Sequence, residues 1–423
     1  MIPSGITFLS GAWIFSHLLI LGAINNCNYR RIVLILSAVL LVTVYLIKPY
    51  TYDLEKYSIY FVTGYIPTTD WHTPDDGFQL DARDTTGDPY TVYELGFRWL
   101  SKVGNFVLPS GSLIPRYDQT FWDFEERGPP RHDAILFLII ISGAASLIFS
   151  TRALLRKMAS SRVAKPDDLG LMLVVIMGSV FFFIGTQNVL RQFLGLVIVL
   201  MALNCAVSKK YAASVLLVIL ASIFHRWMIG FGVAAIIVVE GLSWSQNRWP
   251  LVEVRLSRIT RFEFLSLVAG LTVVIVIKGF LVFGVFHMDI PLIGDLKAYV
   301  LNQGQYQMFE RLDSWIKLGA IVFLFGLSEV VQGVTIISKP LDPRLLRRSI
   351  LFFILPLLIY PEIFARVLLY YWLVEMIFVA WALQSNERRT QLAGAMVFLA
   401  YGIAPNALNI LLGPEWLQFY HEG

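Results

Sequence analysis

Residues 169–207 read LGLMLVVIMGSVFFFIGTQNVLRQFLGLVIVLMALNCAV, and this stretch decides the class of fold. Its single charged residue is Arg191, which lies in the turn at residues 186–192. The apolar runs on either side of that turn approach the length of about 20 residues that a helix needs to cross a bilayer. The stretch therefore predicts two membrane-spanning helices joined by a short turn.

The composition of the whole chain agrees with this local pattern. Of 423 residues, 57% are apolar and 15% are charged, and the mean hydropathy is +0.65. Globular proteins have roughly 45–50% apolar and about 25% charged residues. A water-soluble core cannot cover so much apolar surface with so few charges. The composition therefore excludes a cytosolic enzyme, a secreted disulfide scaffold and a disordered chain.

Reading outward from this stretch predicts an all-α, polytopic membrane protein with about twelve transmembrane helices. The candidate spans lie near residues 6–24, 32–47, 134–150, 169–186, 192–207, 211–224, 228–243, 264–284, 314–337, 349–361, 366–384 and 391–411. These spans divide the chain into helices one and two (1–47), a large loop (48–133) and helices three to twelve (134–423).

The basic residues predict the orientation, because Lys and Arg concentrate in cytoplasmic loops. The large loop contains eight Lys and Arg against fourteen Asp and Glu, a net charge of −6, so we expect it outside. Both termini are then outside as well, and we expect the inside loops to set the topology and to carry no chemistry. Those loops hold 19 of the 34 basic residues: Arg30, Arg31, Arg152, Arg156, Lys157, Arg162, Lys165, Lys209, Lys210, Arg248, Arg255, Arg258, Arg261, Lys339, Arg344, Arg347, Arg348, Arg388 and Arg389.

A few arginines remain in the short outer turns, on the face that is depleted of positive charge. They are Arg191, Arg226, Arg311 and Arg366. An arginine at membrane depth is costly, and it either pairs with a neighbour or serves a function. Because the guanidinium fork matches phosphate oxygens two at a time, four such turns predict a diphosphate-binding site. Headgroup contact or local ion pairing is the alternative for each arginine taken alone.

The large outer loop contains two aromatic amphipathic stretches that predict helices at the membrane surface. In the first, Tyr57, Tyr60 and Phe61 share one helical face, with Asp53 one turn earlier. The second is Tyr93-Glu94-Leu95-Gly96-Phe97-Arg98-Trp99-Leu100. Aromatic rings and carboxylates together suit sugar binding, and an ordinary interfacial aromatic belt is the alternative.

No recognisable motif for nucleotide, metal or redox chemistry is present in the sequence. It has no Walker loop, no dinucleotide fingerprint, no zinc spacing and no nucleophile elbow. We therefore expect no cofactor, no obligatory metal and no nucleic-acid partner.

Several short motifs, in order, resemble the EpsG-like branch of the Wzy-type bacterial polysaccharide polymerases. They are Asp53 with Tyr57 and Tyr60, Tyr93-Glu94-Leu95-Gly96-Phe97, Arg191-Gln192-Phe193-Leu194-Gly195, Phe224-His225-Arg226-Trp227 and Arg366-Val367-Leu368-Leu369-Tyr370-Tyr371. The resemblance spans residues 50–371 and implies a GT-C-like membrane fold. It also implies a glycosyltransferase of the bacterial inner membrane whose active site faces the periplasm.

The implied substrates are oligosaccharide repeat units on undecaprenyl diphosphate, one as donor and one as acceptor, and the product is O-antigen, capsule or exopolysaccharide. Arg191, Arg226, Arg311 and Arg366 would bind the diphosphate. The acceptor base is sought among the outer-face groups Asp53, Glu94, His225, Glu310 and Glu362, with Asp53 and His225 favoured. The residues expected to contact the substrate are Tyr57, Tyr60, Glu94, Gln192 and Tyr370. A chain-length regulator protein is an expected partner.

Three other functions fit parts of this pattern. A flippase for lipid-linked sugars would use similar spans and arginines, but it should have polar residues on both faces of its cavity. A glycan ligase would share the diphosphate chemistry and the large outer loop. A membrane acyltransferase would need a polar partner for His225 that the sequence does not offer.

Overall fold

The computed structural model consists of helices packed side by side. It describes residues 4–25, 29–47, 95–96, 99–100, 103, 133–158, 168–187, 190–225, 227–248, 261–282, 312–332 and 343–403. Every element in these ranges is helical, which confirms the all-α class that the composition predicts.

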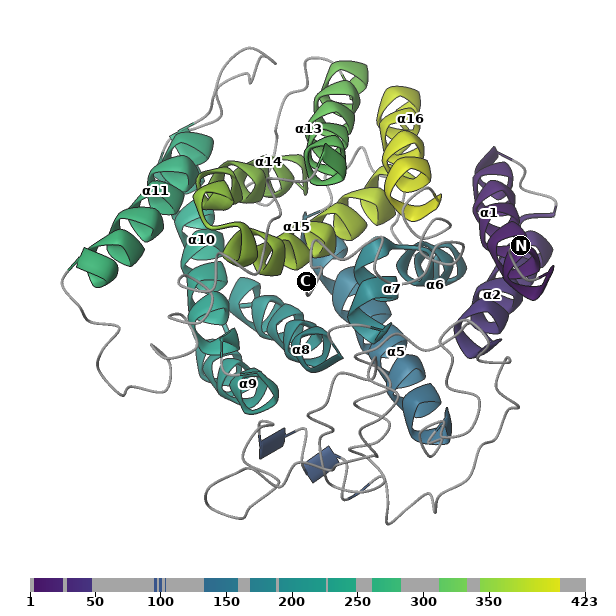
Figure 1. Ribbon diagram of the computed structural model, residues 1–423, viewed down its shortest axis with the longest axis horizontal. Coiled ribbons are helices and arrows are strands. Elements are labelled where there is room, and N and C mark those ends of the chain that lie inside the picture. The colour runs from purple at the N-terminus through teal and green to yellow at the C-terminus, as the bar shows by residue number, and fades with distance from the viewer. Residues whose placement is uncertain are drawn as a thin grey trace, which may run out of the picture.

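The helices follow the order of the predicted spans (Figure 1). They are α1 (Ser4–Asn25), α2 (Arg30–Ile47), α5 (Asp133–Met158), α6 (Leu169–Met177), α7 (Val180–Gln187), α8 (Leu190–Val207), α9 (Tyr211–Phe224), α10 (Met228–Arg248), α11 (Arg261–Val282), α13 (Leu312–Gln332), α14 (Pro343–Ile354), α15 (Pro361–Ala382) and α16 (Arg388–Val397). A 3₁₀ helix (Leu355–Ile359) joins α14 to α15, and a π-helix (Phe398–Ile403) continues α16.

Helix α15 runs through the middle of the assembly, with the α1–α2 hairpin at one edge and α11 at the other (Figure 1). It packs against α5, α6, α7, α14 and α16. Nearly every side chain described from Leu368 to Leu383 is buried. An all-round apolar helix of this kind is typical of a core position.

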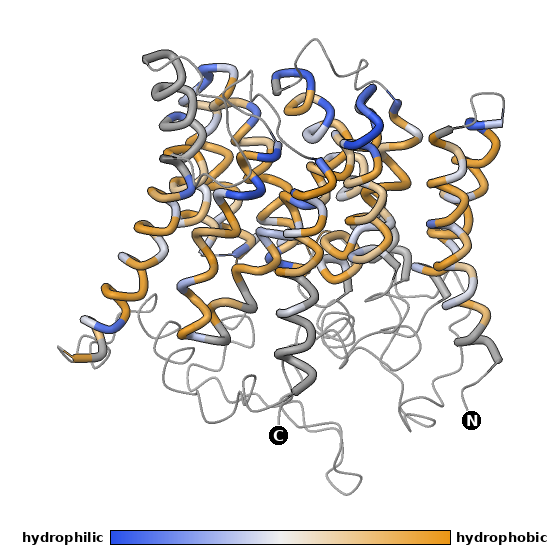
Figure 2. The backbone as a smooth tube through the Cα atoms, turned by 90° about the horizontal axis from the view of Figure 1, so that it is seen from above, coloured by the Kyte–Doolittle hydropathy of each residue, from blue (hydrophilic) through white to orange (hydrophobic). Residues whose placement is uncertain are grey.

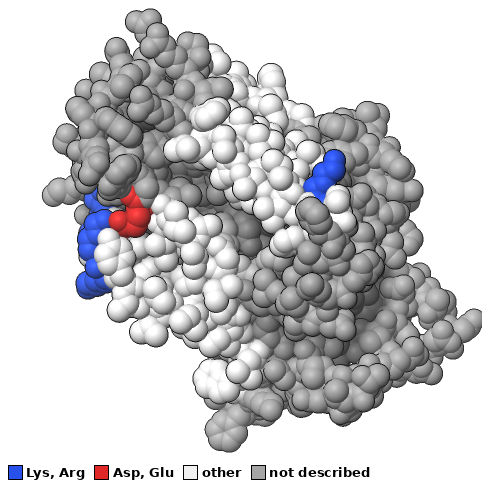
Figure 3. All heavy atoms as spheres, turned by 90° about the vertical axis from the view of Figure 1, so that its left-hand side faces the viewer, with Lys and Arg blue, Asp and Glu red and all other residues white. Residues whose placement is uncertain are grey.

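The described helices are apolar along most of their length, and hydrophilic residues gather at one end of the assembly (Figure 2). Large apolar side chains also cover outward faces: those of α11 include Phe264, Leu265 and Ile275, which are 58–68% exposed. On the face that carries α11, most of the visible charge is confined to one edge (Figure 3). Outward faces that are apolar and carry little charge are typical of a lipid-facing surface.

Helix length and composition support membrane crossing for part of the described chain. Leu190–Val207 and Glu263–Phe280 qualify as full spans, and α6 with α7 forms a third apolar unit that is bent by 59° at Gly178 and Ser179. Five shorter apolar helices accompany them. The number of twelve spans and the orientation of the loops stay predictions.

Ion pairs join helix ends that the sequence assigns to the cytoplasmic side. Arg30 at the start of α2 binds Asp168, the N-cap of α6, at 2.7 Å. Lys209, in the α8–α9 turn, contacts Glu240 of α10 at 2.7 Å, and this hydrogen bond raises the pKa of Lys209. Both contacts therefore join helix ends that the predicted alternating spans place on the same side of the membrane.

Candidate functional site

The outer ends of α8, α9 and α10, as the sequence orients them, form one packed unit. Gly195 of α8 lies so close to Met228 that a Cβ atom there would come within 2.6 Å of Cγ of Met228 and 3.4 Å of the Ala221 carbonyl. Gly195 is one helical turn after Arg191, so the turn that carries Arg191 lies beside the α9–α10 connection. The two motifs that begin at Arg191 and Phe224 are therefore neighbours in space.

A stacked aromatic pair links this unit to α15. The rings of Phe231 in α10 and Tyr370 in α15 lie 3.8 Å apart between centroids, with an interplanar angle of 13°. Tyr370 is 7% exposed and is one helical turn after Arg366 in the sequence. The motif that begins at Arg366 on α15 therefore adjoins the motifs that begin at Arg191 and Phe224.

A segment of the large loop also reaches this region. A Cβ atom at Gly96 would come within 3.0 Å of both the side chain and the carbonyl oxygen of Ile223. Ile223 is two residues before His225, at the end of α9. Part of the motif at residues 93–97 thus packs against the turn that contains His225.

The described side chains among the predicted site residues differ in exposure. Gln192 is buried (3% exposed), and Arg191 is half-buried at the start of α8. His225 is half-buried and forms the C-cap of α9, where its backbone N–H donates to the Ala221 carbonyl at 3.1 Å. Arg366 lies in α15, where the structure describes only its backbone. Six other predicted site residues lie outside the described residues: Asp53, Tyr57, Tyr60, Glu94, Arg226 and Arg311.

A second polar cluster lies among the buried parts of α11, α13, α14 and α15. Arg347 of α14 is fully buried, and its guanidinium contacts Glu375 at 2.8 Å and Glu329 at 3.3 Å. The neighbouring Arg348 pairs with Glu263 of α11, which is also fully buried. Charges inside a membrane protein are costly, so such a cluster has a structural or functional reason.

This cluster corrects one expectation from the sequence. The sequence predicts Arg344, Arg347 and Arg348 in a loop on the inside, and the loop placement is wrong because all three lie in helix α14. Arg344 and Arg347 are buried in it, and Arg348 is half-buried. Glu375, inside the apolar run Leu373-Val374-Glu375-Met376-Ile377, was the signal that could have revealed a buried partner.

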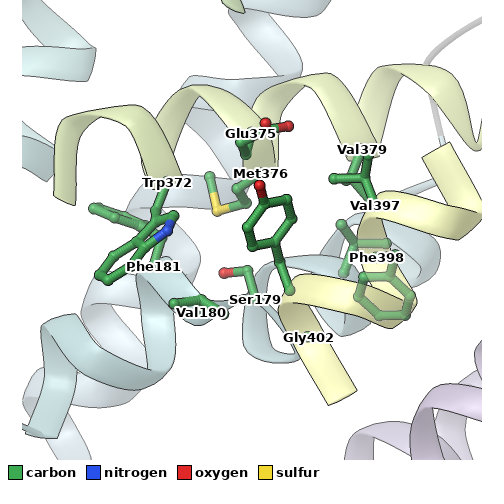
Figure 4. Close-up of a pocket in the computed structure, with 12 residues that line it drawn as sticks. Ser179, Val180, Phe181, Trp372, Glu375, Met376, Val379, Val397, Phe398 and Gly402 are labelled. Atoms are coloured by element: carbon green, nitrogen blue, oxygen red, sulfur yellow. The ribbon is translucent and has the colours of Figure 1, made fainter. Parts of the chain in front are cut away.

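A small cavity adjoins Glu375, between α15, the α6–α7 break and the π-helix (Figure 4). Ser179, Trp372 and Tyr401 contribute its other polar groups. Its volume of about 20 Å³ is enough for an ordered water and far too small for a sugar. This cavity is therefore too small to bind an organic ligand.

Comparison with curated proteins and with solved structures found no match. A protein-family model, that of the EpsG family, matches residues 132–418. The match begins at the end of the large loop, so it includes the motifs at Arg191, Phe224 and Arg366 and excludes Asp53 and Glu94. Because the matched region is more than half of the chain, the protein belongs to the EpsG family.

Proposed function

We propose that this protein is a membrane glycosyltransferase that polymerises oligosaccharide units carried on undecaprenyl diphosphate. Membership of the EpsG family indicates a polymerase-like role in polysaccharide biosynthesis, with lipid-linked saccharides as substrates. The proposal adds the carrier, the outer face of the inner membrane as the location, and O-antigen, capsule or exopolysaccharide as the product.

The observation that carries the proposal is the contact between elements that are far apart in the sequence. Gly195 packs on Met228, Phe231 stacks on Tyr370, and Gly96 packs on Ile223. The elements that carry Arg191, His225 and Arg366 are thereby gathered in one region. Such a convergence is expected where several helices bind a single anionic headgroup.

In the proposed reaction the bond between the donor's anomeric carbon and the diphosphate oxygen breaks. The acceptor hydroxyl attacks the anomeric carbon and loses its proton to a base, and undecaprenyl diphosphate leaves with the electron pair of the broken bond. The activated donor supplies the free energy, so the scheme uses neither ATP nor an obligatory metal.

Arginines would act on the leaving group. Negative charge on the diphosphate grows as the glycosidic bond breaks, and donors that are already in position stabilise this charge in the transition state. We assign this role to Arg191, Arg226, Arg311 and Arg366. The proposed base is Asp53 or His225, because a base must reach the acceptor proton directly or through one water.

Deletion of the gene tests the proposed function. We expect the surface glycan to lose its chain-length ladder on gels and to retain single repeat units. Lipid-linked units that accumulate inside the cell, with none outside, would contradict a polymerase and indicate a flippase. A ladder that stays intact on the carrier but never reaches its final lipid would indicate a ligase.

Substitution of the arginines tests the site. Arg191→Ala and Arg366→Ala should each slow chain extension by about 10²–10³-fold, as removal of one oxyanion donor does. Arg191→Lys should restore only part of the rate, because lysine keeps the charge and loses the planar fork. Arg388→Ala, at an exposed position at the start of α16, is the matched control. An unchanged ladder in both alanine variants would refute the arginine site.

A flippase for lipid-linked sugars is the second candidate, and the buried cluster at Arg347 is the observation that favours it. A transporter needs polar groups in both halves of its pathway. Arg347, Glu329 and Glu375 place charge in the half that the sequence assigns to the cytoplasm. The lipid-linked units measured after gene deletion distinguish the two functions.

A further inference from the structure

Arg347 holds three helices together from a fully buried position. Its Nε lies 2.8 Å from the Glu375 carboxylate of α15, and its Nη1 donates to Ser328 Oγ of α13 at 2.6 Å. The guanidinium carbon lies over the rings of Phe325 and Phe378, 4.5 and 4.6 Å from their centroids. The ring contacts to its planar face, together with the hydrogen bonds from Nε and Nη1, define one orientation of the side chain.

Tyr371 adds a second constraint on the same carboxylate. It is fully buried, one helical turn before Glu375, and its hydroxyl donates to Glu375 Oε1. We call Arg347, Glu375 and Tyr371 the α15 clamp. A rotation of α15 by about 20° would move a side-chain end that is roughly 5 Å from the axis through about 2 Å. This displacement would break a hydrogen bond of ordinary length, so the clamp fixes the rotation of α15.

Helix α15 continues without a break from the clamp to the proposed reaction site. Tyr370, which stacks on Phe231, is only five residues before Glu375, or about 7.5 Å along the helix axis. Arg366 is one turn further toward the start of the helix. Any rotation that the clamp prevents at Glu375 is therefore also prevented at Tyr370 and Arg366.

We propose that the α15 clamp is a positioning device for the outer site. Arg347, Glu375 and Tyr371 are positioning residues that act through α15, and they do not touch the substrate. This inference rests on the proposed function, since the group that it positions is the diphosphate-binding end of α15. A displacement of about 1 Å at a reacting group can cost on the order of a hundredfold in rate.

The chain offers a matched control pair in the same cluster. Arg348 of α14 pairs with Glu263 of α11 and lies 3.8 Å from the Glu329 carboxylate of α13, so these ion pairs join α14 to helices other than α15. Glu263 is fully buried, as Arg347 is. Replacing Arg348 and Glu263 thus removes a buried ion pair of α14 and keeps the Arg347–Glu375 contact that joins α14 to α15.

The experiment compares two uncharged double variants, because a pair replaced by apolar groups is tolerated better than a lone buried charge. The clamp variant is Arg347→Met with Glu375→Gln, and the control is Arg348→Met with Glu263→Gln. Membrane abundance is matched by adjusting expression, and chain extension is measured per folded molecule. We expect the clamp variant to lose up to about a hundredfold and the control to keep its rate.

A structural readout separates positioning from stability. In a background with Cys27→Ser and Cys205→Ser, the variant Phe231→Cys with Tyr370→Cys is treated with a short thiol cross-linker. We expect efficient cross-linking with the native clamp and with the control pair replaced, and a reduced yield with the clamp replaced. Equal cross-linking and equal extension in the clamp and control variants would overturn the inference, as would equal losses in both.

A milder variant covers the case in which the clamp variant does not accumulate. Tyr371→Phe removes one hydroxyl and preserves the shape, and it should lower both the cross-linking yield and chain extension. Unchanged values for Tyr371→Phe would also overturn the inference. Failure of the proposed function would appear separately, as a glycan ladder that survives gene deletion, while the cross-linking yield still tests the clamp.

Discussion

At the scale of single residues, glycines set how closely the helices approach. A Cβ atom at Gly270 of α11 would come within 2.3 Å of the Phe353 carbonyl oxygen and 3.1 Å of Pro356. A Cβ atom at Gly185 of α7 would likewise come within 2.5 Å of Cδ2 of Phe193 in α8. Because real Cβ contacts are longer than this, a side chain at either site would push two helices apart.

Gly270→Ala should destabilise the protein by about 1–3 kcal/mol, since the added methyl group must displace the backbone of α14. Gly279→Ala on the same helix is the control, because no atom lies within 4 Å of its imagined Cβ. Alanine is the better helix former by about 1 kcal/mol, so this control should be neutral or stabilising. Thermal unfolding in lipid nanodiscs measures both, and equal midpoints would contradict the close packing at Gly270.

The residues of the candidate site show what the sequence can and cannot predict. Arg191 and His225 stand out in the sequence because they interrupt apolar runs on the outer side. Glu375 inside an apolar run indicates a buried partner, but the sequence does not identify Arg347 as that partner, because the two are 28 positions apart and basic residues near a helix end usually mark topology. Only the packing of the helices shows that Arg347, one of the basic residues predicted in the inside loops, is buried.

At the scale of elements, the break between α6 and α7 is stabilised by the α1–α2 hairpin. Tyr45 Oη of α2 donates to the Met177 carbonyl at 2.7 Å. The ring nitrogens of His17 lie 2.9 Å from the Gly178 oxygen and 2.8 Å from the Trp13 oxygen, and Trp13 Nε1 donates to the Gly402 oxygen at 2.8 Å. Tyr45 and Trp13 of the hairpin thus satisfy one carbonyl group at the bend between α6 and α7 and one in the π-helix.

Tyr45→Phe should therefore cost about 1–3 kcal/mol, because the Met177 carbonyl would stay buried and unsatisfied. The control is Tyr29→Phe, at a side chain that is 63% exposed, and its effect should lie within about 0.5 kcal/mol. Denaturant or thermal unfolding of the purified proteins gives both values. If Tyr45→Phe were as stable as the control, the hydrogen bond to the α6–α7 break would have no energetic role.

The elements themselves are largely predictable from hydropathy, and their breaks are not. The spans near 192–207 and 211–224 correspond closely to α8 and α9. The single span predicted at residues 169–186 is two helices, because Gly178 and Ser179 interrupt it. Hydropathy does not predict this bend, because the residues before and after it are similarly apolar and are buried on both sides.

At the scale of the whole molecule, charge is distributed unevenly between the two ends of the helix assembly. Ion pairs at one end join α2 to α6, α10 to the α8–α9 turn, and α14 to α11 and α13. The helix ends at Arg191, His225 and Arg366 belong to the opposite end if the spans alternate. The small net charge of +4 conceals this asymmetry.

The asymmetry predicts which end faces the cytoplasm, and cysteine labelling can test it. In a background with Cys27→Ser and Cys205→Ser, single cysteines replace Lys210 and Glu387, both exposed in turns at the basic end. Others replace Asp76 and Asp84 in the acidic large loop. Because basic ends stay in the cytoplasm, an impermeant maleimide should label only the loop positions in intact spheroplasts, and all four positions after lysis.

Labelling of Lys210→Cys before lysis would show that the orientation is the reverse of the predicted one. Arg191, His225 and Arg366 would then lie on the cytoplasmic side. An outer-face polymerase would then be impossible at this site, whereas labelling confined to the loop positions leaves the arginines facing the compartment where the proposed chemistry occurs.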